Sequence, residues 1–210
     1  MYIELNEDFL LNEDKILLNN YRKFRDYNVI RLDLAEAYFL INSVVEFNNK
    51  IPNLEEDSNK QHFIKEAKLS KSHLHYAIIL YTKWFTATKN KPTLKPAKFF
   101  RGINEQYLET HNYIIELRNT YIVHNEKELL GLYSVNIHID SSNEITLSCG
   151  GLEQLTIMDP ILKEFKECIK IVHNYIVANE IPKYENHLKK ELIEKKIIEK
   201  LVNDNMSNLL

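Results

Sequence analysis

The side chains with the clearest capacity for chemistry lie together in the segment LRNTYIVHN, residues 117–125. Arg118 carries a planar fork of donors that matches the oxygens of a phosphate or a carboxylate. Asn119 follows it directly, and His124, whose side chain titrates near neutral pH, comes after five intervening residues. Such a set can bind an anion and move a proton.

Arg118 is also unusual for the helix face on which the sequence places it. At 100° per residue with Arg118 as the origin, His111 lies at about 20°, Ile122 at about 40° and Ile114 at about −40°. Arg118 is therefore expected at the centre of an apolar arc. A guanidinium in such a place is almost never buried without a partner.

Three kinds of partner for Arg118 are open at this point. One is a structural salt bridge with an acidic residue of a neighbouring helix, such as Asp33, Glu36 or Glu46. The second is a carboxylate of another subunit, met across an interface. The third is a phosphate held in a cleft, which the fork of arginine donors suits well.

The segment resembles the motif of the HEPN superfamily, whose members are helical bundles. They carry an arginine, usually followed by a polar residue, and then a histidine four to six residues later. Arg118, Asn119 and His124 match this pattern, although Val123 stands where a small residue is frequent. The resemblance is sharp over about nine residues and covers residues 27–180 only as architecture.

The resemblance implies a metal-independent endoribonuclease that needs no cofactor. In that chemistry the 2′-hydroxyl of RNA attacks the neighbouring phosphorus and leaves a cyclic phosphate end. His124 would act as general base or acid, Arg118 would stabilise the phosphoryl oxygens, and Asn119 would orient the phosphate or the histidine. Because one histidine cannot easily be acid and base in one step, a homodimer with two motifs is implied.

The family also suggests a biological role, which is that of a toxin, neutralised by an antitoxin protein, or of a phage-defence protein. A different class of function fits the same residues. In that alternative the chain is a non-catalytic helical interaction module, or an anion- or nucleic-acid-binding module, and Arg118 and His124 are a structural pair.

A basic segment precedes the motif, because no acidic residue lies between Glu66 and Glu105 while eight basic residues do. It is a candidate footprint for RNA phosphates, with Trp84, Phe99 and other aromatic residues for base stacking. In the competing interpretation the lysines solvate a helix and a loop while the aromatic residues fill the core. The RNA-binding candidates are Lys83, Lys89, Lys91, Lys95, Lys98 and Arg101.

The remaining histidines and the cysteines give weaker signals. His73 and His75 point in different directions on a helix and make a poor metal pair, and His111 is expected to be a core histidine with a satisfied hydrogen bond. Neither cysteine, Cys149 or Cys168, has metal-ligand spacing, so no metal site is predicted. No glycine-rich phosphate loop is present in the sequence.

Composition excludes several classes of protein. The chain of 210 residues is 44% apolar and 27% charged, which is typical of a globular protein of one domain. A net charge of −3 argues against indiscriminate coating of nucleic acid. The acidic N-terminus lacks a secretory pattern, and no apolar run approaches the ~20 residues that span a bilayer. A cytoplasmic protein with free thiols and no membrane partner is expected.

The elements that must position the motif are mostly helices. Residues 1–20 predict a short helix or an extended arm. Apolar spacings of three and four predict long helices over about 27–48, 60–88, 97–127 and 160–179, and a last helix over about 183–203. Pro52, the loop KNKPTLKPAK and Pro182 are predicted to separate these helices.

One stretch has the period of a β-strand instead. Apolar and polar residues alternate in LYSVNIHID and again in EITLSC, with SSN as a plausible turn between them. This pattern predicts a β-hairpin over about 132–149. The fold class expected is mainly α: a single domain over 1–210, an up-and-down bundle of four to five helices with one inserted hairpin.

Overall fold

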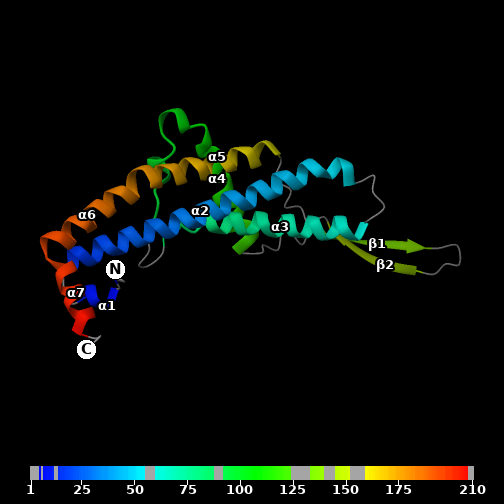
Figure 1. The fold of residues 1–210 in the computed structure, drawn as a ribbon. Coiled ribbons are helices and arrows are strands. Elements are labelled where there is room, and N and C mark those ends of the chain that lie inside the picture. Colours follow the sequence, from blue (N-terminus) through cyan, green and yellow to red (C-terminus); the bar gives the residue numbers. More distant parts are fainter. Residues whose placement is uncertain are drawn as a thin grey trace.

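The computed structural model describes residues 5, 7–11, 14–54, 60–87, 92–123, 133–139, 145–151 and 159–207. Within these ranges the chain is mainly α-helical (Figure 1), as predicted. The helices are α1 (Glu7–Leu11), α2 (Lys15–Leu54), α3 (Lys60–Thr82), α4 (Tyr107–Leu117), α5 (Asp159–Tyr175), α6 (Ile181–Glu194) and α7 (Ile197–Ser207).

Helix α2 is the axis of the molecule, and its 40 residues give it a length of about 60 Å. It begins well before the predicted residue 27 and continues through Pro52 to Leu54, so the predicted boundaries were wrong. A proline in a helix lacks the N–H that would bond to the carbonyl four residues earlier. So close to the C-terminus of α2 few further intrahelical hydrogen bonds follow it, and little of the helix is disturbed.

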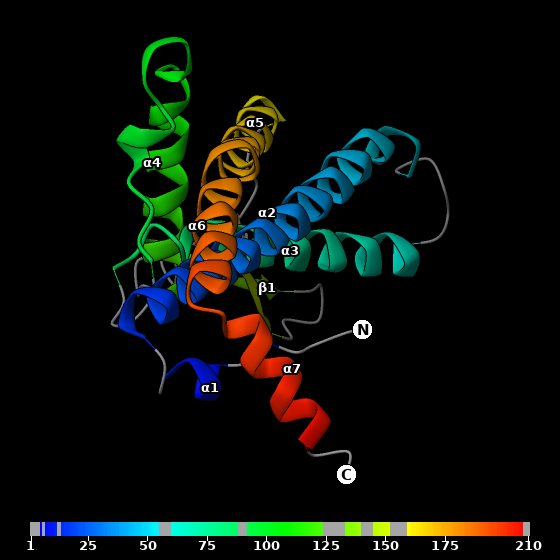
Figure 2. The ribbon, with the colours of Figure 1, turned by 60° about the vertical axis from the view of Figure 1, so that its left-hand side comes forward.

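Two helical rods run antiparallel to α2. One is α3, which is joined to α2 by the ion pair of Lys83 with Asp33 at 2.9 Å. The other consists of α5, the π-helix η5 (Ile176–Glu180) and α6. Its direction follows from two contacts, because Tyr184 stacks on Tyr27 at 5.4 Å while the earlier Lys166 lies over the later Tyr38. Figure 1 shows both rods beside α2. In Figure 2, α5 lies between α4 and the C-terminal half of α2.

The main core lies among α2, α3, α4 and α5. Its fully buried side chains include Leu34, Ile78, Ile114 and Phe165, which come from these four helices. A smaller core near the N-terminal end of α2 joins α1, α6 and α7, and its buried members are Leu10, Leu17, Leu18, Leu188 and Ile197. The described helices thus form one bundle with an extension at one end (Figure 1).

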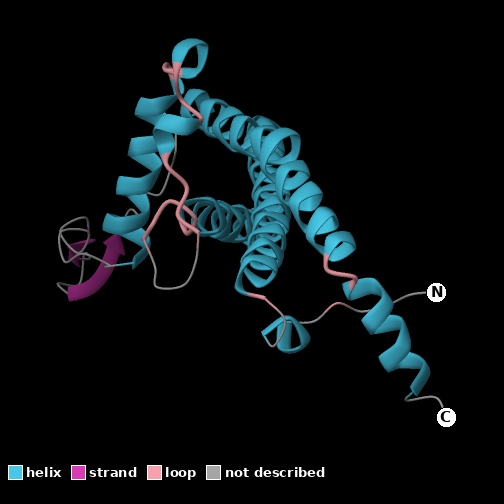
Figure 3. Cartoon of the chain, turned by 90° about the vertical axis from the view of Figure 1, so that its left-hand side faces the viewer, coloured by secondary structure: helices cyan, strands magenta, loops and turns pink. Residues whose placement is uncertain are grey.

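The segment before α4 departs from the prediction of one helix over about 97–127. Two short 3₁₀ turns, Pro96–Lys98 and Gly102–Asn104, precede α4, which begins only at Tyr107 (Figure 3). Gly102 has φ +61°, a left-handed conformation that an α-helix cannot contain and that glycine adopts without strain. The spacing of apolar residues does not indicate a left-handed residue, so this interruption of the predicted helix could not be seen in the sequence pattern.

Pro182 was predicted to separate two helices, and this prediction was wrong. The chain remains helical from α5 through η5 into α6, because Pro182 lies in the first turn of α6, where its missing N–H is tolerated. The predicted last helix over about 183–203 is instead divided. Lys196, with φ 52°, lies between α6 and α7 and turns the chain.

Two strands lie between α4 and α5 in the sequence. They are β1 (Tyr133–Ile139) and β2 (Ile145–Gly151), which pair antiparallel with Ile137 opposite Leu147. In the view of Figure 1 they extend to the right of the helices. Among the described helices, none combines the length and apolar character that crossing a bilayer requires.

Candidate functional site

Arg118 stands at the junction where α4 ends and a π-helix, η3 (Arg118–Val123), begins. The buried residues of α4 are Thr110, His111, Ile114 and Leu117. On the helical wheel these residues centre near Ile114, roughly 40° from Arg118. On the wheel Arg118 lies inside this arc, between Ile114 and His111, but its side chain is only partly buried in the structure.

The Arg118 guanidinium contacts the next side chain in the motif. Its Nη1 donates a hydrogen bond to Oδ1 of Asn119 at 2.9 Å, and Asn119 itself is exposed. Within the part of the chain that the structure describes, Arg118 forms no ion pair with a carboxylate. The salt bridge considered from the sequence is thus not formed with Asp33, Glu36 or Glu46.

Asp33 has other partners. Its Oδ2 accepts a hydrogen bond from Nε1 of Trp84 at 2.8 Å and lies 2.9 Å from Nζ of Lys83. The Lys83 ammonium in turn lies 5.2 Å from the centre of the Trp84 ring. This carboxylate therefore holds the C-terminal end of α3 against α2, and its charge is already balanced by a lysine.

The π-helix changes how the motif is displayed. A π-turn closes its hydrogen bonds over five residues instead of four, so the α-helical wheel no longer describes positions beyond Arg118. Such turns often occur at functional sites. His124 lies outside the described residues, so its predicted approach to Arg118 stays a prediction.

His111 is a core residue, as expected, and not part of an open site. It is 1% exposed, and its Nδ1 lies 2.9 Å from the hydroxyl of Tyr81, which is fully buried. The rings of Phe85 and Phe100 pack on the imidazole at 4.5 and 5.1 Å. Burial lowers the pKa of His111 to about 4, so the imidazole is neutral at physiological pH.

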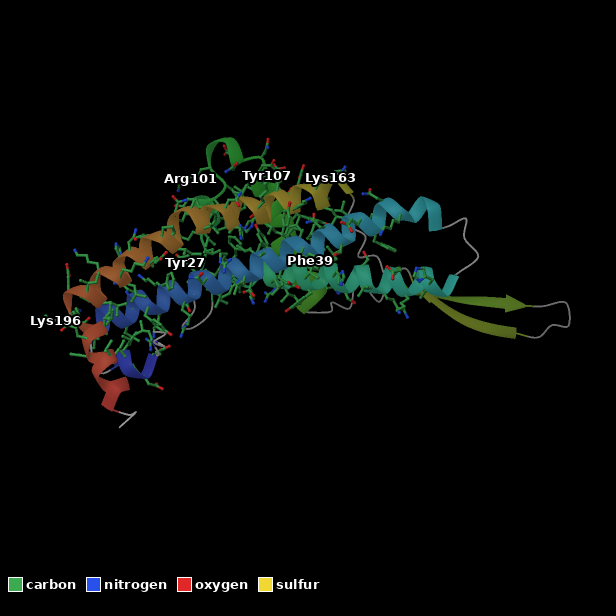
Figure 4. The ribbon with its side chains drawn as sticks, in the orientation of Figure 1. Tyr27, Phe39, Arg101, Tyr107, Lys163 and Lys196 are labelled. Carbon is green, nitrogen blue, oxygen red and sulfur yellow. The ribbon has the colours of Figure 1, made fainter. Side chains whose placement is uncertain are left out.

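The predicted RNA-binding cations differ in their surroundings: in the described part of the chain some form ion pairs and others are exposed without one. Lys83 and Lys98 form ion pairs, with Asp33 and Glu180 respectively. Lys95 and Arg101 are exposed, and Figure 4 shows Arg101 at the outer edge of the molecule. The other two candidates, Lys89 and Lys91, lie outside the described residues.

The aromatic residues of the shorter segment 83–101, which holds the RNA-binding candidates, fill the core. Trp84, Phe99 and Phe100 are 5%, 3% and 2% exposed, and Phe85 packs partly buried against them. Side chains so enclosed cannot stack on the bases of an RNA strand. This segment therefore offers cations to a phosphate but no aromatic platform to a base.

Glu180 is a buried charge that the sequence did not indicate. It is 5% exposed at the end of η5, and Oε1 accepts a hydrogen bond from Nζ of Lys98. The Lys98 ammonium also lies 5.3 Å from the ring of Tyr175. Burial and the charge of Glu180 raise the pKa of Tyr27 on α2. These contacts fasten the turns before α4 to the rod of α5 and α6.

No metal site was found in the described ranges, where no three histidine, cysteine or acidic side chains gather as ligands would. Burial raises the pKa of the Cys168 thiol to about 12, and its Sγ contacts the backbone carbonyl of Tyr107 at 3.5 Å. A thiol in this state is protonated at neutral pH and behaves as a small core side chain.

The arrangement around Arg118 is suited to binding an anion. A partly exposed guanidinium with no carboxylate partner in the described ranges presents donors in a fork, and Asn119 fixes one of them. Comparisons with known protein families, curated proteins and solved structures found no match to this chain. The candidate site therefore stands on these side chains alone.

Proposed function

We propose that this protein is a metal-independent endoribonuclease of the HEPN type, with Arg118, Asn119 and His124 as its site. The observation that carries the proposal is the state of Arg118. Its guanidinium is partly exposed, is oriented by Asn119, and has no carboxylate partner in the described part of the chain. An arginine held in this way at a π-turn has donors left for an anion.

The proposed reaction is an internal transfer at phosphorus. His124 removes the proton of the 2′-hydroxyl as the O2′–P bond forms, and the P–O5′ bond breaks. Arg118 binds the phosphoryl oxygens, where negative charge grows in the transition state. The 5′-oxygen leaves with a proton from an acid, and the products are a 2′,3′-cyclic phosphate and a 5′-hydroxyl.

The acid in this reaction is the motif of a second subunit. Two copies of His124, one as base and one as acid, would serve a single phosphate in a homodimer. In this proposal the fold is the up-and-down bundle with an inserted hairpin, and the biological role is that of a cytoplasmic toxin or phage-defence protein. A toxin of this kind would have an antitoxin protein as its partner.

The experiment is RNA cleavage with and without EDTA by the wild type, His124→Ala and Arg118→Ala. We expect cleavage that resists EDTA, gives cyclic phosphate ends, and falls by at least about 10²-fold in either variant. His187→Ala is the matched control, because His187 is an exposed histidine on α6, and it should cleave as the wild type does. Circular dichroism and size-exclusion chromatography with light scattering establish folding and the dimer.

Two outcomes would contradict this function. Cleavage retained in His124→Ala would remove the proposed general base. A folded, dimeric wild type that cleaves none of several RNAs would favour the non-catalytic module, in which Arg118 binds an anion without breaking a bond.

A further inference from the structure

A groove runs between α2 and α5, on a side of α5 different from the one that packs on α4. It has a volume of about 270 Å³ and is open to solvent along part of its length. Its floor is apolar, formed by Leu34 and Ile169, and Tyr38 lines one wall. The described residues that line it are Leu34, Ala35, Tyr38, Ile169, Lys170, His173 and Asn174.

Lysines of α5 flank this groove on one side. On the α5 wheel Lys163, Lys166 and Lys170 lie at about 120°, 60° and 100° from Ile169, so all three project to the Tyr38 side. The Lys166 ammonium lies 5.1 Å from the centre of the Tyr38 ring. Figure 4 shows Lys163 at the N-terminal end of α5.

Among the side chains that the structure describes, little negative charge faces these lysines. Glu167 lies 3.3 Å from Lys170, with both side chains largely exposed, and such surface pairs are weak. Among the described residues, Lys163 and Lys166 form no ion pair with a carboxylate. Glu164, between them in the sequence, turns away and accepts a hydrogen bond from Thr110 of α4.

Positive charge continues at the other end of the groove. Arg31 lies about 20° from Tyr38 on the α2 wheel, two turns toward the N-terminus, and makes no ion pair within the described ranges. Near it, Asn174 and His173 contact each other at 3.4 Å and offer an amide and an imidazole to the groove. From Arg31 to Lys163 the cations extend for roughly 20 Å along the seam.

We infer that this groove binds single-stranded RNA, with one base against Tyr38 and the adjoining phosphates on the lysines of α5. An aromatic wall within a line of cations is how proteins bind single strands without reading their sequence. Lys166 covers the Tyr38 ring now, and its flexible stem allows the ammonium to move from the ring to a phosphate. A purely apolar partner would instead desolvate these lysines without pairing them.

This inference rests on the proposed function, because it supplies the surface that holds the RNA substrate. The line of cations is longer than the pocket around Tyr38, which favours a strand over a free mononucleotide. Helix α5 also packs directly on α4, the helix that ends at Arg118. RNA held on α5 would therefore be held by a helix that contacts the site helix.

The test is binding of a fluorescent uridine oligonucleotide of about 12 residues, measured by anisotropy in the uncleaving His124→Ala background. Tyr38→Ile should weaken binding about tenfold through the loss of stacking. Lys166→Gln should weaken binding and reduce the slope of log K against log salt by about 0.7, the value for one lost phosphate contact on a single strand.

Two residues serve as matched controls, one next to Tyr38 in the sequence and one on a different helix. Phe39 follows Tyr38 on α2 but is 64% exposed and does not line the groove. Lys183 lies 5.1 Å from the centre of the Tyr184 ring on α6, the same distance as that of Lys166 from the Tyr38 ring. Phe39→Ile and Lys183→Gln should bind the oligonucleotide as the background protein does.

Several results would overturn the inference. One is a background protein that does not bind the oligonucleotide even at low salt. Another is that the Tyr38 and Lys166 variants bind as tightly as the background protein does. A third is that the two control variants lose as much affinity as the groove variants do. Binding of uridine monophosphate as tight as that of the oligonucleotide would identify a mononucleotide site instead.

Cleavage assays on the groove variants in the otherwise wild-type chain separate the two proposals. If binding depends on the groove but no RNA is cleaved, only the ribonuclease function is refuted. If RNA is cleaved and the groove variants cleave it as the wild type does, only the RNA-binding role of the groove is refuted.

Discussion

His111 should make the stability of the fold depend on pH, and the substitution His111→Leu tests this. The imidazole is 1% exposed, and burial lowers its pKa from 6.5 to about 4. Because the folded pKa lies below the unfolded one, the unfolded chain binds the proton more readily between these values. The stabilisation by neutral His111 is complete above the unfolded pKa and is lost as the pH falls toward the folded pKa.

The size of the effect follows from the two pKa values. A difference of about 2.5 units corresponds to a ceiling of about 3.4 kcal/mol, which is reached only below both pKa values. Between about pH 7.5 and about pH 5, the proton-linkage expression gives a loss of about 2 kcal/mol from this one residue. That is a large fraction of the stability of an ordinary domain.

Urea unfolding of the wild type and of His111→Leu over this pH range measures the effect. Leucine removes the titrating group while keeping an apolar side chain, so the difference between the two free energies of unfolding cancels all other titrations. This difference should fall by about 2 kcal/mol from pH 7.5 to pH 5. The exposed His187 is the control, and His187→Ala should keep a constant difference from the wild type.

A constant difference between wild type and His111→Leu would refute the reasoning. It would mean that the imidazole takes up its proton equally in both states, and hence that the site is hydrated when folded. The hydroxyl of Tyr81 loses its partner in the variant. That loss lowers the stability by a similar amount at every pH, because the tyrosine stays protonated throughout the range, so it does not imitate the predicted trend.

Three other substitutions probe the bundle, each by urea unfolding at neutral pH. Arg118→Ala should change the free energy of unfolding by less than about 1 kcal/mol, because its only described partner is the neighbouring Asn119. Lys98→Met should cost about 2 kcal/mol by leaving Glu180 buried without its cation, and the double variant with Glu180→Met should regain most of this loss. Asp33→Ala should cost about 2 kcal/mol, since the indole N–H of Trp84 loses its acceptor. A loss above about 3 kcal/mol in Arg118→Ala would instead assign that arginine to the core.

The long helices could be predicted because their signals are local and repeated. Apolar residues at spacings of three and four run through α2, and the structure buries Ile30, Leu34, Ile41 and Val44 along one face. The helix predicted over about 160–179 begins almost where expected, because α5 starts at Asp159 with Pro160 in its first turn. In both cases a few neighbouring residues are enough to determine the element.

The turns before α4 could not be predicted, because they depend on one glycine and on a distant contact and not on the spacing of apolar residues. Phe99 and Phe100 read as part of a helical pattern, yet both are buried between two 3₁₀ turns, the second of which begins at the left-handed Gly102. The tertiary tie of Lys98 to Glu180, 82 positions apart, also acts here. No local window contains both of these residues.

The residues of the candidate site come from the sequence and stay a prediction, whereas the helix geometry expected around Arg118 was wrong. A wheel drawn for a uniform α-helix put Arg118 at the centre of the buried face, whereas α4 ends just before it and a π-turn follows. The bulk of the buried face belongs to His111, Ile114 and Leu117. A partly exposed arginine can stay hydrated and needs no internal carboxylate, and Asp33 pairs with Lys83 instead.

The run of basic residues in the sequence and the lysines that the fold brings together along the groove are two different cationic surfaces. Residues 83–101 are conspicuous as a run without acids, yet Lys83 and Lys98 are neutralised by carboxylates from distant helices. On α5, Glu164 and Glu167 interrupt the lysines in the sequence. In space Glu164 points toward α4, and the lysines gather along the groove.

The two cationic surfaces can be compared directly in the oligonucleotide assay. Lys95 and Arg101 are exposed cations of the predicted segment that form no ion pair within the described ranges. Lys170 lines the groove, and Lys166 lies on the ring of Tyr38, which lines it too. Because only the groove pairs its cations with an aromatic wall, Lys166→Glu with Lys170→Glu should weaken RNA binding far more than Lys95→Glu with Arg101→Glu. Each pair changes the net charge by four units, so general repulsion of the RNA is the same in both. A larger loss in the Lys95 and Arg101 pair would show that the charge run, and not the groove, meets the RNA.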